Sequence, residues 1–204
     1  MAEEIGIIIQ LGEWVIDQAC QQAASWPDDI KVSVNVSSVQ FRSPRLVEAF
    51  SSALMHSQLP AGRLELEITE SVLLTNSTET MATLHKLRAL GLRIAIDDFG
   101  TGYSSLSYLQ SFPFDKLKID QSFVHDLTST EGSKLIVRAI VSLGKSLGMQ
   151  ITAEGVENIA QFDQAAAEGC DEVQGYFLSE PVSAPQVSSV IRKFERPNIV
   201  PWPL

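Results

Sequence analysis

Six polar residues stand near the C-terminal ends of six short segments in which apolar and polar residues alternate. They are Asn35, Glu67, Asp97, Lys118, Glu154 and Gln174. We interpret four of them, the amide of Asn35 and three carboxylates, as oxygen donors to a metal, and Asp98 adds a fifth donor beside Asp97. Crowded carboxylates repel one another unless cations neutralise them, and all-oxygen ligand sets suit Mg²⁺ or Mn²⁺. The residue types therefore predict a site for two hard divalent cations, with one aspartate bridging both.

Lys118 is the one cation among these six residues. Its role is either charge balance or the stabilisation of negative charge that develops on a phosphoryl oxygen. Two metal ions, a lysine and carboxylates suit the attack of water on a phosphodiester. Metal-assisted enolisation with a lysine base is the alternative that the residue types leave open. The histidines lie outside this set, so zinc chemistry is not expected.

The segments that carry these residues alternate with helical patterns along the chain. Period-two patterns predict strands near residues 31–37, 64–69, 92–97, 115–120, 150–154 and 171–176. Helical periods predict a first helix over about the first 25 residues and a second one capped by Ser43, with Pro44 as its first residue. Further helices are predicted near residues 81–91, 104–110, 132–147, 159–168 and 184–194. Strand-helix units with short connections predict a parallel sheet with right-handed crossovers.

A barrel explains the polar residues on one face of each strand, because an open parallel sheet buried on both faces carries continuous apolar strands. The predicted fold is α/β, a TIM-type (β/α)8 barrel, whose active site lies at the C-terminal strand ends. Such barrels need about 250 residues, so 204 residues that open with a helix predict an incomplete barrel with about six strands. The rival fold is a doubly wound sheet, but no Gly-rich phosphate fingerprint follows the first strand. We expect one domain over residues 1–204.

The composition narrows the class of partner. The chain has 15 basic and 25 acidic side chains and a net charge of -10, which disfavours DNA and RNA unless a cation intervenes. Its longest apolar stretch is far below the roughly 20 residues that span a bilayer, so no membrane contact is expected. Cys20 and Cys170 stand far apart in sequence and are interpreted as buried thiols of a reducing compartment, the cytoplasm.

Five segments of the chain closely resemble the signature segments of the EAL-domain cyclic di-GMP phosphodiesterases. They are ELEITES at 65–71, IDDFGTGYSSL at 96–106, LKID at 117–120, AEGVE at 153–157 and QGYF at 174–177. The resemblance implies a hydrolase that converts cyclic di-GMP, a bacterial second messenger, to linear pGpG with two Mg²⁺ or Mn²⁺ ions. It also implies a homodimer, and a sensory or cyclase domain upstream in the parent protein.

The resemblance also assigns roles to residues at matching positions. The metal ligands match Asn35, Glu67, Asp97, Asp98 and Glu154, with Asp97 as the bridge. Lys118 matches the lysine near the attacking water, and Gln174 matches a glutamine of the same site. Glu70 and Glu157 match supporting acidic residues, and Glu70 is associated with holding the loop from Asp98 to Ser105. Gln121 departs from the family, which usually has arginine there.

The Glu-Ala-Leu segment that names the family contains a metal-ligand glutamate and has no counterpart in this sequence. We therefore expect an N-terminally truncated domain in which Met1 corresponds to an internal methionine, with slow or no hydrolysis by this chain alone. The alternative function is a catalytically inactive module that binds cyclic di-GMP or mediates an interaction.

Overall fold

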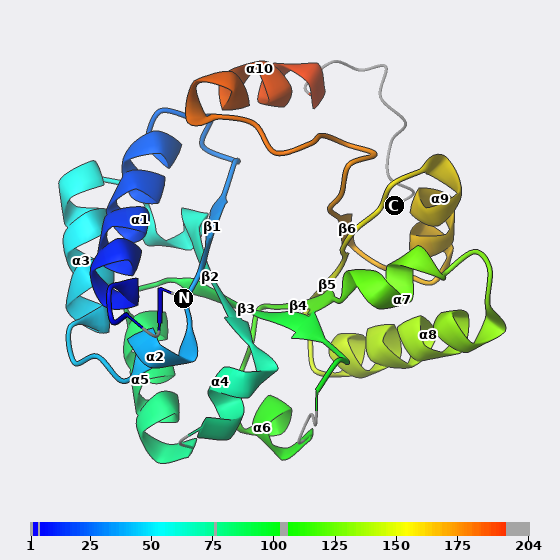
Figure 1. Ribbon diagram of the computed structural model, residues 1–204, viewed down its shortest axis with the longest axis horizontal. Coiled ribbons are helices and arrows are strands. Elements are labelled where there is room, and N and C mark those ends of the chain that lie inside the picture. Colours follow the sequence, from blue (N-terminus) through cyan, green and yellow to red (C-terminus); the bar gives the residue numbers. More distant parts are fainter. Residues whose placement is uncertain (1, 4, 76, 103–105, 195–204) are drawn as a thin grey trace. The chain divides into compact units, whose positions relative to one another are not determined.

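The structure is a computed structural model that describes residues 2–3, 5–75, 77–102 and 106–194. The chain divides into two compact units, Met1–Asp115 and Lys116–Leu204. In each unit three parallel strands alternate with helices, as labelled in Figure 1. The predicted alternation of strands and helices is therefore confirmed.

Unit 1 is built on a parallel sheet in the order β1-β2-β3, with bounds Val32–Asn35, Leu64–Thr69 and Arg93–Phe99. Its helices are α1 (Ile8–Ala23), α2 (Ser38–Phe41), α3 (Leu46–Ser57), α4 (Glu70–Thr75), α5 (Ser77–Ala89) and α6 (Leu106–Ser111), with a 3-10 turn at Ala61–Arg63. Helices α1 and α3 pack side by side (Figure 1).

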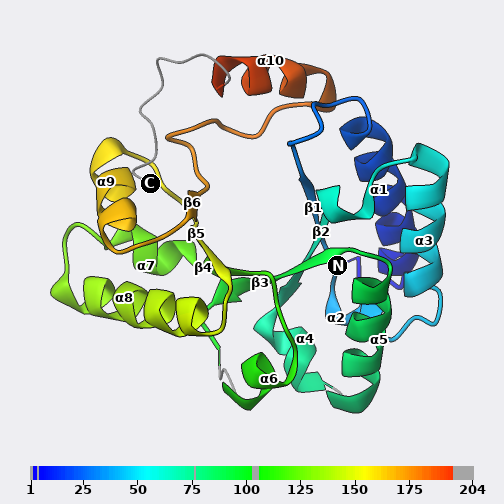
Figure 2. The ribbon, with the colours of Figure 1, turned by 180° about the vertical axis from the view of Figure 1, so that it is seen from behind.

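Unit 2 carries the parallel strands β4 (Lys116–Ile119), β5 (Gln150–Ala153) and β6 (Glu172–Val173). Its helices are α7 (Gln121–His125), α8 (Glu131–Ser146), α9 (Ile159–Ala167) and α10 (Ala184–Phe194). Helix α8 packs on β4 and β5 (Figure 2). Its Gly144 faces the end of the Ile151 side chain, which would have to shift to admit a Cβ at that position. Helix α8 therefore approaches β5 closely at Gly144.

Strand β2 is buried on both faces, although one face is polar. In β2 the apolar Leu64, Leu66 and Ile68 are buried, and so are the alternating carboxylates Glu65 and Glu67. Buried polar side chains need partners, and Glu65 accepts hydrogen bonds from Ser33 and Arg93, both at 3.3 Å. The polar face of β2 is thus a second interior surface rather than a solvated one, whereas Ser33 and Asn35 on the polar face of β1 are exposed.

In each unit an aspartate is hydrogen-bonded, through both its backbone N–H and its carboxylate, to one residue near the start of a neighbouring strand. We call this arrangement an aspartate bridge. Asp115 donates its N–H to the carbonyl of Ile94 (2.9 Å), while its carboxylate accepts the Ile94 N–H (2.8 Å) and an Arg88 guanidinium N–H. In unit 2, Asp171 donates to the carbonyl of Ile151 (2.8 Å) and accepts its N–H (2.7 Å). Lys145 forms the ion pair with Asp171. A charged side chain from the preceding helix therefore completes both bridges.

Two features of the secondary structure differ from the sequence prediction. Helix α3 begins at Leu46 with Arg45 as its N-cap, because Ser43 forms a local turn in which its hydroxyl accepts the Arg45 N–H at 3.3 Å. The short helices α2, α4 and α7 were not predicted, since segments of four to six residues are too short to show a helical period. They fall directly after the strands or one to two residues beyond them.

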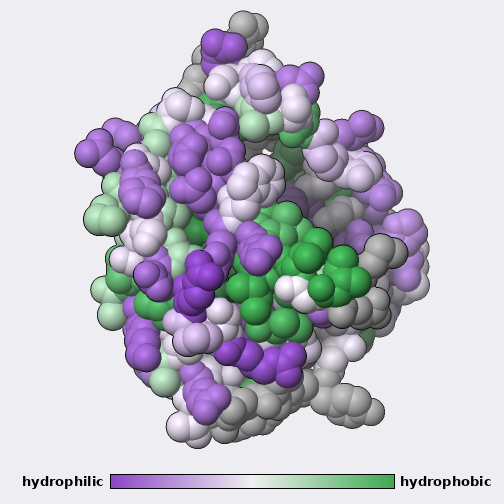
Figure 3. Space-filling model, turned by 60° about the vertical axis from the view of Figure 1, so that its left-hand side comes forward, coloured by the Kyte–Doolittle hydropathy of each residue, from purple (hydrophilic) through white to green (hydrophobic). Residues whose placement is uncertain are grey.

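Helix α1 is apolar on more than its packed face. It buries Gly12, Ile16, Cys20 and Ala23, whereas Leu11 and Trp14 are exposed at 42% and 59%. Figure 3 shows apolar side chains gathered on one face of the structure. The packing of unit 1 therefore leaves much of the apolar surface of α1 uncovered.

The two cysteines are buried and are not joined by a disulfide. Burial raises the pKa of the Cys170 thiol to about 12 and that of Cys20 to about 11. Both thiols therefore stay protonated at neutral pH, as expected of cysteines that act as small apolar residues. Over the described part of the chain, no helix is long and apolar enough to cross a membrane.

Candidate active site

The C-terminal strand ends of unit 1 carry three of the predicted metal ligands on one face. Asn35 of β1 is the register partner of Glu67 in β2, and Glu67 in turn is the partner of Ala95 in β3. Asp97 lies two residues beyond Ala95 and thus points to the same face. Glu67 and Asp97 are buried, whereas Asn35 is exposed. Two buried carboxylates and an amide therefore share one face of this sheet.

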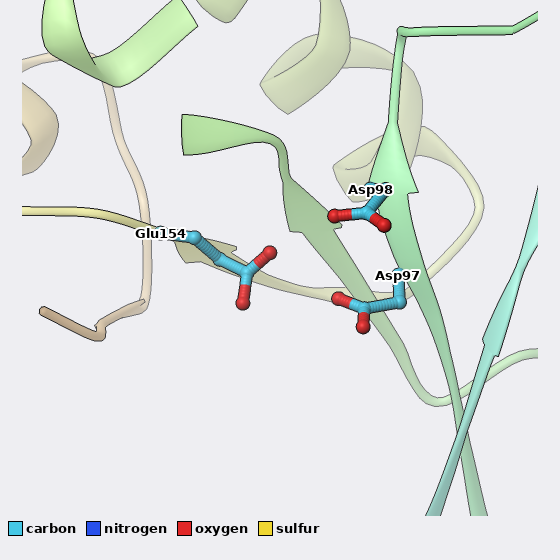
Figure 4. Close-up of side chains that lie close together, drawn as sticks. All are labelled: Asp97, Asp98 and Glu154. Carbon is cyan, nitrogen blue, oxygen red and sulfur yellow. The ribbon is translucent and has the colours of Figure 1, made fainter. Parts of the chain in front are cut away.

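Asp98 breaks the alternation of β3. Its φ of 52° lies in the left-handed region, which aspartate tolerates better than most residues. Successive side chains of a regular strand point to opposite faces, but Figure 4 shows the carboxylates of Asp97 and Asp98 extending to the same side of β3. The unusual backbone therefore provides two adjacent carboxylates where a regular strand would provide one.

Glu70, the first residue of α4, contacts the loop that follows β3. Its Oε1 accepts the N–H of Gly100 at 2.8 Å, as the association of Glu70 with this loop leads one to expect. Its Oε2 is buried and has no hydrogen-bond partner among the described residues. A Cβ on Gly102 would lie 2.8 Å from that oxygen, so the loop passes very close to the carboxylate. Residues 103–105 of this loop lie outside the described part of the chain.

We expect Glu70→Ala to loosen the start of this loop, because the variant removes the acceptor of the Gly100 N–H. Hydrogen-deuterium exchange of a peptide covering residues 98–102 should become faster. Glu70→Gln is the matched control, since its amide oxygen still accepts that hydrogen bond. Equal exchange in Glu70→Ala and in the unaltered chain would contradict a holding role for Glu70.

Unit 2 places a buried lysine and a carboxylate in direct contact. Lys118 of β4 is the register partner of Thr152 in β5, and Glu154 lies two residues beyond Thr152, just after the strand. The two side chains thus share a face, and Lys118 Nζ lies 2.8 Å from Glu154 Oε1. Only 4% of the Lys118 side chain and 13% of the Glu154 side chain are exposed. A desolvated ion pair therefore occupies these two strand ends.

The segments after β5 and β6 fix the surroundings of Glu154, which Figure 4 shows just beyond its strand. The Gln174 N–H donates to the carbonyl of Ala153 (2.9 Å), and the Val156 N–H donates to the carbonyl of Gln174 (3.0 Å). The turn at Gly155 requires glycine, because its φ is 70° and a Cβ there would lie 2.6 Å from the Gln121 Cβ. The departure from the family at position 121 therefore lies against the turn that follows Glu154.

Gln174 and Glu157 are both exposed. The backbone N–H of Glu157 donates to the side-chain oxygen of Gln161 at 2.7 Å, just before α9. Gln174 lies two residues beyond Glu172 of β6, the register partner of Thr152, so it points to the same face as Lys118 and Glu154.

The sequence analysis overlooked three residues on this face. Lys116 Nζ lies 2.7 Å from Glu172 Oε2, and the Thr152 hydroxyl donates to the same oxygen at 3.1 Å. The sequence does contain a signal for them, since Lys116 and Glu172 precede Lys118 and Gln174 by two residues and therefore share their face.

The donor atoms of both units suit a hard divalent cation. The candidate ligands are carboxylates and an amide, with no histidine or cysteine. Buried carboxylates on one face of unit 1 repel one another, and a cation offsets that repulsion.

A comparison with protein families matches the model described as "EAL domain" to residues 1–181. The chain belongs to the EAL domain family. The resemblance read from the five signature segments is thereby confirmed, and this EAL domain can be compared with relatives whose names state an activity.

One relative is the bifunctional diguanylate cyclase/cyclic di-GMP phosphodiesterase MucR of Pseudomonas aeruginosa. It is 42% identical over 191 residues, which are 92% of this chain and 28% of that protein. The EAL domain spans about a quarter of the length of the curated relatives it matches.

Solved structures confirm the fold class. The PaMucR phosphodiesterase in complex with c-di-GMP matches with a TM-score of 0.87 and 43% identity, over 91% of this chain and 77% of that one. A manganese and c-di-GMP complex of BlrP1 from Klebsiella pneumoniae matches with a TM-score of 0.76 and 28% identity, over 85% and 44% of the two chains. The predicted α/β fold, an incomplete TIM-type barrel with six strands, is therefore confirmed.

Proposed function

We propose that this EAL domain hydrolyses one phosphodiester bond of cyclic di-GMP to give linear pGpG, with the help of two divalent cations. The observation that carries the proposal is the buried ion pair of Lys118 and Glu154 at strand ends, within segments that match the family. The names of the relatives support the substrate, since MucR and NbdA of Pseudomonas aeruginosa are both called cyclic di-GMP phosphodiesterases.

The proposed cations are Mg²⁺ or Mn²⁺. The side chains that would hold them are Asn35, Glu67, Asp97, Asp98 and Glu154. When bound, such ions neutralise phosphate charge and lower the pKa of a coordinated water. The oxygen-only donor set and the BlrP1 complex that contains manganese support this choice of metal.

The protein's own residues have distinct proposed roles in this reaction. The ammonium of Lys118 orients the attacking water and stabilises the charge that develops on a phosphoryl oxygen. Glu154 holds that ammonium, and Gln174 offers an amide to the phosphate. Glu70 and Glu157 support the loops. Water adds its oxygen to phosphorus, the bond from phosphorus to the 3′ oxygen breaks, and a proton passes to that oxygen.

The test is the conversion of cyclic di-GMP by the purified chain in the presence of Mn²⁺, with products separated by chromatography beside authentic pGpG. In keeping with the slow hydrolysis expected of this chain alone, we expect pGpG to accumulate slowly, EDTA to stop its formation, and added Mn²⁺ to restore it. Binding of cyclic di-GMP without conversion would contradict the enzymatic function and favour the alternative, a catalytically inactive binding module. Neither binding nor conversion would overturn the proposal altogether.

We also propose that the domain acts in the cytoplasm as a homodimer and does not bind nucleic acid. Its net charge of -10 supports the last point, since phosphate backbones are repelled without an intervening cation. Buried thiols that are not joined by a disulfide support a reducing compartment.

A further inference from the structure

The side chain of Gln161 joins two segments that lead away from the ion pair of Lys118 and Glu154. Gln161 lies in the first turn of α9 and is 3% exposed. Its Oε1 accepts the backbone N–H of Glu157 at 2.7 Å, and its Nε2 donates to the carbonyl of His125, the last residue of α7, at 3.3 Å. One buried amide therefore uses both its acceptor and a donor to bridge the segment after β5 and the helix after β4.

This amide bridge closes a ring that begins at the ion pair. Lys118 Nζ and Glu154 Oε1 lie 2.8 Å apart at one end of the ring. Next to them, the Glu154 N–H donates to the carbonyl of Ile119 at 3.2 Å. His125 follows Lys118 by seven residues, and Gln161 follows Glu154 by seven residues. Two segments of equal length are thus joined at both of their ends.

The turn at Gly155 is the part of the ring with the most backbone freedom. Gly155 has a φ of 70° and no side chain that could restrict its backbone by packing. The Val156 N–H donates to the carbonyl of Gln174 at 3.0 Å, which ties the turn to the segment after β6 and not to the segment after β4. Within the described ranges, residues 155–158 make no direct hydrogen bond to α7. The Gln161 side chain therefore provides their hydrogen-bonded connection to that helix.

Helix α7 offers this bridge a well-held partner. It follows β4 after a single residue, Asp120, whose Oδ1 accepts the Ser122 N–H at 2.9 Å and so caps the helix. Val124 of the same helix is fully buried. A side chain bound to the His125 carbonyl is therefore bound to the segment that carries Lys118.

We propose that Gln161 is a positioning residue, which fixes the turn after Glu154 against the helix after Lys118 and so keeps this carboxylate on the Lys118 ammonium. Without the amide bridge, the Gly155 turn can shift relative to α7, and the Glu154 carboxylate shifts with it. The inference deepens the proposed function, because it concerns the ion pair to which that function assigns the attacking water.

The first test variant is Gln161→Met in the full chain. Methionine has a similar length but makes neither hydrogen bond of the bridge, so hydrogen-deuterium exchange of a peptide covering residues 154–160 should become about tenfold faster. For cyclic di-GMP, kcat should fall about tenfold with little change in KM, because the substrate still binds but meets a misplaced ion pair.

The second variant, Gln161→Glu, separates the two hydrogen bonds of the bridge. An ionised glutamate still accepts the Glu157 N–H but cannot donate to the His125 carbonyl. The Glu157 amide, followed by NMR, should therefore keep its slow exchange, while kcat falls as in Gln161→Met. Full activity of Gln161→Glu would show that Gln161 serves only its own loop, and it would overturn the inference.

Gln164→Met is the matched control. Gln164 lies on the same helix and donates its Nε2 to Glu168 Oε1 at 2.8 Å, so this variant removes a glutamine hydrogen bond from α9 and leaves the bridge intact. Exchange of residues 154–160 and kcat should both stay unchanged. An unchanged kcat in folded Gln161→Met would contradict the positioning role.

Crystal structures keep this inference separate from the proposed function. In Gln161→Met the distance from Lys118 Nζ to Glu154 Oε1 should lengthen beyond hydrogen-bonding range, about 3.5 Å. If the unaltered chain converts no cyclic di-GMP, the proposed function fails, and this distance alone decides the role of Gln161. A distance that stays short would overturn that role.

Discussion

Asp97→Asn should remove most of the stabilisation that Mn²⁺ gives to the folded chain. An ion that binds only the folded state stabilises it by mass action, by about 2.7 kcal/mol at one hundred times its dissociation constant. Asparagine keeps the shape of Asp97 but offers no negative charge and only one good oxygen donor. The melting temperature of the unaltered chain should therefore rise with Mn²⁺ in scanning fluorimetry, whereas that of the variant should scarcely move.

The same substitution should lower turnover of cyclic di-GMP on the order of 10²-fold or more, the usual loss when an electrostatic contact to a transition state is removed. Asp163→Asn is the matched control, since Asp163 is exposed on α9 and is not among the proposed ligands. It should keep both the metal-dependent shift and the turnover. An undiminished shift in Asp97→Asn would mean that this carboxylate does not hold the ion.

Lys118→Met should abolish most turnover and leave cyclic di-GMP binding measurable. Methionine keeps the apolar stem of the side chain and removes the ammonium, so the loss concerns charge more than volume. We expect kcat to fall at least about 10²-fold, with the dissociation constant for the nucleotide changed far less. Stopped assays for kcat and calorimetry for binding give the two quantities separately.

Stability separates the catalytic role of Lys118 from a structural one. Breaking a buried ion pair by removing one partner costs about 3 kcal/mol, because the remaining charge loses its compensation. Lys118→Met should therefore be less stable than the unaltered chain in urea, and adding Glu154→Gln should recover much of that loss. Turnover should stay low in the double variant. Recovery of turnover together with stability would show that the ammonium serves only the fold.

The strands and the facing of their side chains could be predicted from the sequence, because a period of two fixes which residues share a face. Asn35 and Glu67 are direct register partners, as their matching places at the ends of β1 and β2 suggest. The left-handed backbone of Asp98 could not be predicted in this way, since no residue pattern distinguishes it from a regular strand position. That the carboxylates of Asp97 and Asp98 lie on the same side of β3 is therefore seen only in the structure.

Side-chain contacts between strands could not be predicted from the sequence either. Lys116 forms an ion pair with Glu172, a carboxylate two strands away, and this contact requires the register of three strands. A strand as short as β6, with two residues, contributes too little pattern for its register to be inferred. Local periodicity thus predicted which site residues share a face of a strand. Which of their side chains come into contact depends on tertiary packing.

The two aspartate bridges set the same spacing, from the bridged residue to the site carboxylate, in both units. The bridges of Asp115 and Asp171 engage Ile94 and Ile151, and in each strand the site carboxylate, Asp97 or Glu154, follows three residues later. A slip of one residue would turn the whole strand over and remove that carboxylate from its face. The register that aligns the site carboxylate is therefore fixed at the opposite end of the strand, where Arg88 and Lys145 form ion pairs with the two bridging aspartates. Loop substitutions at the reactive end that leave these two bridges intact should therefore not shift the strand register.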